Sequence, residues 1–216
     1  MFAVIFEVEP KAERRGEYLE LASFLKPSLE KIDGFIEIER FASRRGEGRV
    51  LSLSSWRDEK SVIRWRVQGA HHEVQTKGRS GIFQNYHLRV GEVTSDTNLP
   101  AGEITGQHRF DATETGPAKV ATITEIQPLG ETAAGLTVPL EPATTGLLGV
   151  EWFESIYAPG KSLLLASWRD TEAAEAWRPA PVAGAEIRHR RVRIIRDYGM
   201  FDRREAPQYY PPAPAS

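Results

Sequence analysis

The chain has 216 residues, no cysteine and a formal net charge of −2. Without cysteine it has no disulfide, no thiolate nucleophile and no zinc–thiolate site, and its nearly neutral charge argues against a nucleic-acid partner. The longest apolar run near the start, residues 2–6, is too short for a signal peptide or a membrane-spanning helix, so we expect a cytoplasmic protein without a membrane partner.

Strand and helix patterns alternate along the first part of the chain. Apolar residues alternate or run continuously in the expected strands, and they recur at three and four in the expected helices. Pro27 should kink or divide the first helix, and Asp58 should cap the second. In chain order the expected strands span residues 2–9, 35–41, 50–56 and 82–93, and the expected helices span residues 12–32 and 59–78. This β-α-β-β-α-β order predicts a ferredoxin-like α+β unit.

The chain also contains an internal repeat. The segment SLSSWRDEKSVIRWR (residues 52–66) aligns without a gap with LLASWRDTEAAEAWR (residues 164–178), at an offset of 112 residues. We therefore expect two copies of one unit, over residues 1–93 and 119–205. Residues 94–118, rich in Thr, Gly, Asp and Pro, would be a linker, and the Pro-rich residues 206–216 an extended tail.

Two fused units solve a packing problem. An antiparallel sheet with two helices on one face leaves its other face bare, and a second copy of the sheet can cover it. We expect the two sheets to pack face to face as a pseudo-dimeric α+β barrel within one chain. Edge strands would leave room for a further homodimer.

The first unit carries a spaced pattern of aromatic and polar residues. They are Trp56, Arg57, Asp58, Glu59, Trp65, Arg66, His71, Gln75, Gly78, Arg79 and the strand through Tyr86. This layout resembles the antibiotic biosynthesis monooxygenase family of the dimeric α+β barrel superfamily, most clearly over residues 2–93 and more weakly over 119–197. Members of that family include cofactor-independent quinone-forming oxygenases, haem-degrading monooxygenases and proteins with no assigned activity.

The repeat also indicates which half holds a site. Residues found in both halves, such as Trp56 with Trp168 and Asp58 with Asp170, should serve the fold. Past them, His87 matches His189 at an offset of only 102, so ten residues are missing from the second half. The missing stretch corresponds to residues 67–79, where the first half places most of its titratable residues. We therefore expect one site, in the first unit.

His71 is the candidate catalytic residue, because histidine is the usual proton acceptor near neutral pH. On a continuous helix it borders an apolar stripe of Ile63, Val67, Ala70 and Val74, while the neighbouring His72 points nearer to Trp65. Adjacent histidines on a helix diverge by about 100°, so no metal site is expected. The candidate substrate-binding residues are Trp65, His72, Gln75, Asn85 and Tyr86. Asn85 and Tyr86 take opposite faces of one strand, and which face lines a pocket stays open.

The resemblance implies a cofactor-independent monooxygenase that oxidises a small aromatic or quinol-like substrate with O₂. A non-catalytic, ligand-binding or structural member of the fold is the first alternative. Haem binding and degradation is the second, although Gln75 stands where the haem-degrading members that this chain resembles carry their axial histidine.

Overall fold

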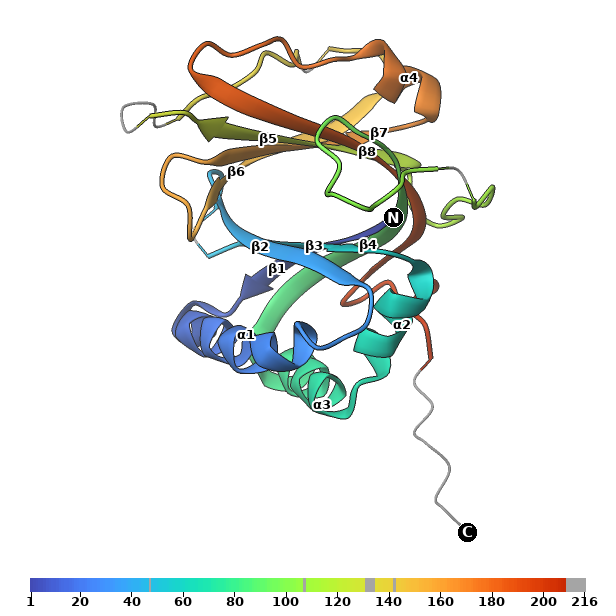
Figure 1. The fold of residues 1–216 in the computed structure, drawn as a ribbon. Coiled ribbons are helices and arrows are strands. Elements are labelled where there is room, and N and C mark those ends of the chain that lie inside the picture. The colour runs from blue at the N-terminus through green and yellow to red at the C-terminus, as the bar shows by residue number, and fades with distance from the viewer. Residues whose placement is uncertain (47, 107, 131–134, 142, 209–216) are drawn as a thin grey trace.

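The computed structural model describes residues 1–46, 48–106, 108–130, 135–141 and 143–208, so most of the expected tail, including Tyr209 and Tyr210, lies outside the described residues. Eight antiparallel strands form a closed barrel in the order β1-β3-β2-β6-β7-β5-β8-β4 (Figure 1). The strands are β1 (Phe2–Pro10), β2 (Phe35–Ser43), β3 (Val50–Trp56), β4 (Phe83–Asp96), β5 (Val120–Pro128), β6 (Leu147–Ser155), β7 (Ser162–Trp168) and β8 (Ala185–Gly199).

The barrel confirms the expected packing of two four-stranded sheets. We call β1–β4 with their helices the first unit, and β5–β8 with theirs the second unit. Apolar side chains of both sheets, such as Ile5, Phe41, Ile123 and Phe153, fill the barrel interior. Long pairing of β4 with β8 closes one seam and a short pairing of β2 with β6 closes the other. The outer strands of the two units thus pair with each other within the chain, and a further homodimer stays a prediction.

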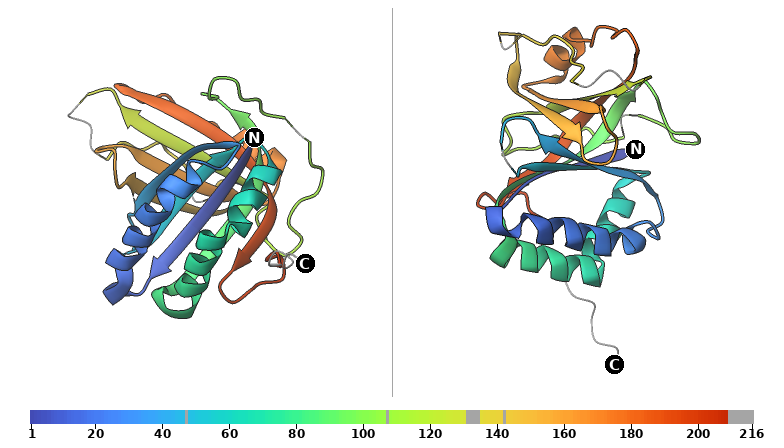
Figure 2. Two further views of the ribbon diagram at one scale, coloured as in Figure 1. Left: turned by 60° about the horizontal axis from the view of Figure 1, so that its bottom comes forward. Right: turned by 90° about the vertical axis from the view of Figure 1, so that its left-hand side faces the viewer.

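Three helices cover the outer face of the first sheet (Figure 2). A short 3₁₀ turn (Ala12–Arg14) leads into α1 (Arg15–Leu29), and α2 (Glu59–Val67) and α3 (Gly69–Lys77) are followed by one π-helical turn (Gly78–Ile82). Pro27 does not divide α1, because it lies near the C-terminal end, where buried Leu25 and Leu29 hold the last turns against the sheet. Asp58 accepts a hydrogen bond from the backbone N–H of Ser61, which confirms the predicted cap.

The expectation of a single helix over residues 59–78 is wrong. Gln68 takes an extended conformation, with φ −62° and ψ 129°, and separates α2 from α3. The backbone N–H of Gln68 still donates to the carbonyl of Trp65, while its side chain caps the new helix. Local capping therefore compensates for the lost helical hydrogen bonds, and the chain changes direction between Trp65 and His71.

Among its described residues, the second unit has one short helix, α4 (Thr171–Ala176), capped by Asp170 as predicted. The described part of this unit has no counterpart of α1 or α3. Instead, Val138, Leu140 and Trp177 pack over the outer face of its sheet. In the second unit, these side chains thus occupy the place that helices take in the first unit.

The strand registers correct one detail of the repeat. Glu7 lies opposite His87, and its counterpart Glu125 lies opposite Arg188, so the last strands correspond at an offset of 101 rather than 102. His189 is therefore the counterpart of Leu88. His87 points into the barrel, where it bonds Asp197, whereas His189 points outward and bonds Thr124. The two histidines do not share a structural role.

Candidate active site

A cavity of about 670 Å³ lies between the first sheet and its helices. Its floor consists of two rows of side chains that cross five strands and point toward the helices. The first row is Arg40, Ser52, Phe6, Leu88 and Tyr198, and the second is Ile38, Ser54, Val4, Val90 and Arg196. Because β8 supplies the last residue of each row, the second unit completes the site of the first.

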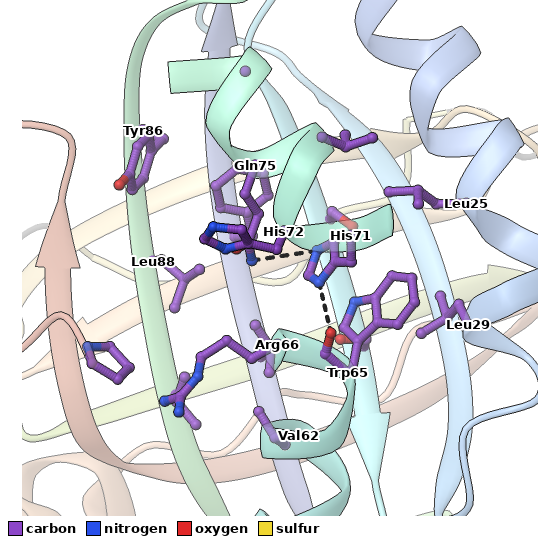
Figure 3. A pocket seen from close by; sticks show the side chains of 18 of the residues that line it. Leu25, Leu29, Val62, Trp65, Arg66, His71, His72, Gln75, Tyr86 and Leu88 are labelled. Atoms are coloured by element: carbon purple, nitrogen blue, oxygen red, sulfur yellow. Dashed lines mark hydrogen bonds between the residues drawn. The ribbon is translucent and has the colours of Figure 1, made fainter. Parts of the chain in front are cut away.

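The roof and one end of the cavity come from helices and from the end of the described chain. Helix α1 contributes mostly aliphatic side chains, while α2 and α3 contribute Trp65 and the polar groups (Figure 3). Ala206, Pro207 and Gln208 close the side next to β8. The lining is thus largely apolar with a few convergent polar groups, which is the composition of a small-molecule site.

The ring of His71 is fixed at both nitrogens (Figure 3). Its Nδ1 lies 2.9 Å from the carbonyl oxygen of Trp65, and its Nε2 lies 3.4 Å from Nε2 of Gln75. A carbonyl oxygen only accepts, so Nδ1 carries the proton and Nε2 keeps its lone pair. Burial lowers the pKa of His71 to about 4. The imidazole is therefore neutral at neutral pH, with Nε2 as a hydrogen-bond acceptor.

The break at Gln68 creates this arrangement. The side chain of Gln68 accepts a hydrogen bond of 2.7 Å from the backbone N–H of His71, which starts α3 at a new angle. The imidazole of His71 then stacks on the indole of Trp65, with ring centroids 4.1 Å apart and planes 14° apart. On one continuous helix, residues six apart point about 120° away from each other and could not stack. The apolar stripe read from a continuous helix is wrong for the same reason: Ile63 is 41% exposed and Val67 is 39% exposed.

Most of the candidate residues from the sequence meet at the cavity. Trp65, His71, His72, Gln75 and Tyr86 line it, and they come from α2, α3 and β4. Asn85 is exposed and does not line the cavity; its side-chain oxygen accepts a hydrogen bond from the backbone N–H of Tyr86. The Tyr86 face of β4 is thus the one that faces the site.

Several lining residues escaped the sequence analysis. Arg40, Tyr18 and Ser52 come from three separate elements. Arg40 and Ser52 lie on the helix-facing side of β2 and β3, and Tyr18 lies on α1 among the residues that line the cavity. Arg203 follows β8, and its guanidinium donates to the hydroxyl of Tyr86. A signal was present for Arg40, because strand alternation puts it on the same face as Ile38. Nothing in the sequence links Arg203 to the first unit.

The described residues contain no group of three or more His, Asp or Glu side chains placed to hold a metal ion. Haem ligation by His71 would require Nε2 to exchange its contact with Gln75 for iron, since Nδ1 is committed to Trp65. Among the helices of the described chain, none is long and apolar enough to cross a membrane.

The fold and the cavity define the class: a dimeric α+β barrel built within one chain, with a largely apolar cavity in its first unit. An aldoxime dehydratase crystallised with butyraldoxime shares this fold, with a TM-score of 0.57 and 13% identity over 90% of this chain and 79% of that one. The family model described as antibiotic biosynthesis monooxygenase matches residues 1–77.

Two curated proteins are similar in sequence. The jasmonate monooxygenase ABM of Pyricularia oryzae is 41% identical over 221 residues, which cover 99% of this chain and 100% of that protein. The uncharacterized protein YqjZ of Bacillus subtilis is 30% identical over 92 residues, covering 43% of this chain and 78% of YqjZ. The chain belongs to the antibiotic biosynthesis monooxygenase family, and its function is that of a monooxygenase of this type.

Proposed function

We propose that this monooxygenase oxidises a small, mostly apolar molecule in the first-unit cavity, with His71 as the proton acceptor. The observation that carries the proposal is the lone pair of His71 Nε2 at the edge of a largely apolar cavity. Trp65 and Tyr86 supply walls against which a flat ring can pack. Gln75 and His72 offer hydrogen-bonding groups beside it.

The first candidate substrate is jasmonate. A relative that is 41% identical over its whole length bears that substrate in its name. Because the two sequences are related over their whole length, the residues that form the two cavities are related as well. Jasmonate is a small carboxylate on a cyclopentanone ring with a hydrocarbon chain, which suits a cavity of about 670 Å³. An aromatic quinol or anthrone is the second candidate, favoured by the aromatic walls and by the neutral His71 beside them.

The two candidates differ in their need for electrons. Oxidation of an anthrone-type CH₂ to a carbonyl by O₂ yields water and takes all four electrons from the substrate. Hydroxylation of a saturated C–H takes two electrons from the C–H bond and two more from a separate reductant. We therefore propose a cofactor-independent reaction for quinol-type substrates, in which removal of a phenolic proton by His71 leaves an electron-rich anion. Jasmonate oxidation would draw on an external two-electron donor.

The test follows oxygen into product. Purified protein is incubated under ¹⁸O₂ with jasmonate, and separately with hydroquinones and anthrones, each with and without NADH or NADPH. A product that gains one ¹⁸O atom, and that is lost in His71→Asn, supports the proposal. Tight binding of these compounds without any oxygen incorporation would instead support a ligand-binding role.

Haem is the remaining alternative from the sequence, and it has its own readout. We expect the purified protein to be colourless, and haemin titration to give no sharp, stoichiometric Soret band, because Gln75 occupies the place of the ligand expected from the resemblance. A tight one-to-one complex that is lost in His71→Ala would favour haem chemistry over the cofactor-independent reaction.

A further inference from the structure

Arg40 is a buried cation at one end of the cavity. It lies on β2, is only 8% exposed, and heads the first floor row, next to Ser52 of β3. Its Nε is buried without a hydrogen-bond partner. Burying a charge without an opposite charge is costly, so a buried guanidinium needs a reason.

Each of the other buried arginines of the described chain is paired with a carboxylate. Arg89 pairs with Glu7, and Arg190 pairs with Glu125 and Glu37. Within the described residues, Arg40 forms no ion pair with an Asp or Glu, and its polar neighbours are the neutral side chains of Ser52 and Tyr18. Arg40 thus differs from its buried counterparts in facing a cavity instead of a carboxylate.

Two hydroxyls line the cavity beside Arg40. Ser52 is the strand partner of Arg40, and both side chains influence the pKa of the buried Tyr18 on α1. Burial raises the pKa of Tyr18 above its usual value of 10, so the phenol keeps its proton at neutral pH. A guanidinium and two O–H groups therefore meet at one end of the cavity. A carboxylate, which only accepts hydrogen bonds, complements such a set.

The repeat shows that the fold does not need this arginine. At the same offset of 112 that aligns the two halves, Arg40 corresponds to Trp152 on β6. Trp152 packs in the apolar cluster that fills the second unit. The cation thus occurs in the unit that has a cavity, and an apolar ring replaces it in the unit whose space is filled.

A second cluster of arginines stands at the opposite end, near β8. Arg66, Arg196 and Arg203 line the cavity there, but they are more exposed, and Arg203 is bonded to Tyr86. With neighbouring strands about 4.8 Å apart, the β2 and β8 ends of a floor row are roughly 19 Å apart. A small acid cannot contact both ends. The desolvated Arg40 end is the stronger anchor, because charge-assisted hydrogen bonds gain strength where water is excluded.

We infer that Arg40, Tyr18 and Ser52 form a carboxylate-binding subsite, and that the natural substrate is a small carboxylic acid bound through its anion. This inference rests on the proposed function for the identity of the cavity as the substrate site. It deepens that function by assigning the chemical class of the substrate and its orientation. The carboxylate lies at the β2 end, and the hydrocarbon part extends toward Trp65 and His71.

Binding measurements test the subsite without requiring turnover. Calorimetry or thermal shift compares jasmonic acid, phenylacetate and octanoate with their methyl esters, on the wild type, Arg40→Gln and Arg66→Gln. We expect the wild type to prefer at least one acid over its ester by 10-fold or more. Arg40→Gln should lose about 10- to 100-fold of acid affinity and leave ester affinity unchanged. Arg66→Gln should change acid affinity by less than about 3-fold.

Folding is checked on the same samples. Arg40→Gln removes a buried charge that has no carboxylate partner, so it should keep the wild-type melting temperature. Arg40→Trp introduces the residue found at the equivalent position of the second unit, and this second variant should also lose acid binding. The subsite is overturned if no acid is preferred over its ester, if the preference survives in both Arg40 variants, or if Arg66→Gln abolishes it. Arg40-dependent binding of jasmonate without oxygen incorporation would sustain the subsite and defeat the proposed oxidation.

Discussion

Trp65 and His71 are joined twice, once through their rings and once through the backbone. The imidazole stacks on the indole with centroids 4.1 Å apart, and His71 Nδ1 donates to the Trp65 carbonyl oxygen at 2.9 Å. The stack fixes the plane of the imidazole, and the hydrogen bond fixes its tautomer. Together they present the lone pair of Nε2 at the edge of the cavity.

The first prediction separates the two nitrogens of His71. His71→Asn can still donate to the Trp65 carbonyl from the place of Nδ1, but it lacks the acceptor at Nε2. Turnover should fall by about 10²–10⁴-fold in both His71→Asn and His71→Ala, the usual contribution of a positioned base. Stability should fall mainly in His71→Ala, by about 1–2 kcal/mol, because it loses the hydrogen bond and the stack. Steady-state kinetics and thermal unfolding of both variants measure this. A His71→Ala protein that is largely unfolded, yet turns over normally per folded molecule, would show that the histidine is structural.

The second prediction concerns the helix break. Gln68→Ala removes the cap on His71 and should cost about 1 kcal/mol of stability. Because the same cap sets the start of α3, turnover should fall at temperatures where the variant is still fully folded. Gln68→Asn, with a shorter side chain that caps helices well, is the matched control and should retain both properties. Equal turnover of Gln68→Ala and wild type at low temperature would contradict this.

The third prediction contrasts two tryptophans. Trp168 is fully buried and donates from Nε1 to Thr122 Oγ1 at 2.9 Å. Trp168→Ala should cost about 3–5 kcal/mol, because it leaves a cavity in the packed second unit. Trp65→Ala should cost less, because its ring already borders open space, but it should weaken substrate binding. Urea unfolding of both variants decides the order. A larger loss for Trp65→Ala than for Trp168→Ala would show that the cavity wall is a core element.

The fourth prediction concerns acid. The pKa values of His71 and His189 are both lowered to about 4, chiefly by burial. The unfolded chain, with a histidine pKa near 6.5, therefore binds protons more readily than the folded chain between these values. The free energy of unfolding should fall as the pH drops from 6.5 to 4. His189→Gln should reduce this slope while leaving stability at pH 8 nearly unchanged.

The pKa of His87 is shifted in the opposite direction, so this residue serves as an internal check. Despite the opposing effect of burial, its hydrogen bond to Asp197 and its ion pair with Glu7 raise its pKa. Its contribution is therefore complete below pH 6.5 and is lost as the pH rises through the higher folded value. His87→Gln should therefore remove the gain in stability that this residue gives as the pH falls from 8 toward 6.5, and it should leave the slope below pH 6.5 nearly unchanged. Chemical denaturation from pH 4 to 8 measures all three proteins, and identical slopes would show that these histidines do not titrate as described.

The sequence by itself determined the fold class, the repeat and the half that holds the cavity. Strand alternation, the Asp58 and Asp170 caps and the repeated tryptophans are local patterns, so they can be read without knowledge of long-range contacts. The same local patterns placed Trp65, His71, His72, Gln75 and Tyr86 around one site, because these residues lie on neighbouring elements of the chain, α2, α3 and β4. A local pattern failed at Gln68, where a side-chain cap competes with helix continuation at similar energy.

Only the tertiary structure decided which face of β4 lines the cavity and which other groups reach it. Arg40, Tyr18 and Ser52 lie on separate elements, and barrel closure brings β8 of the second unit and the tail residues 206–208 against the first unit. Such contacts depend on strand register and on the seam between the units. A one-residue change in register turns every side chain of a strand to its other face, as the separate roles of His87 and His189 show. Pairing across the barrel fixes that register, and no single segment of the sequence contains it.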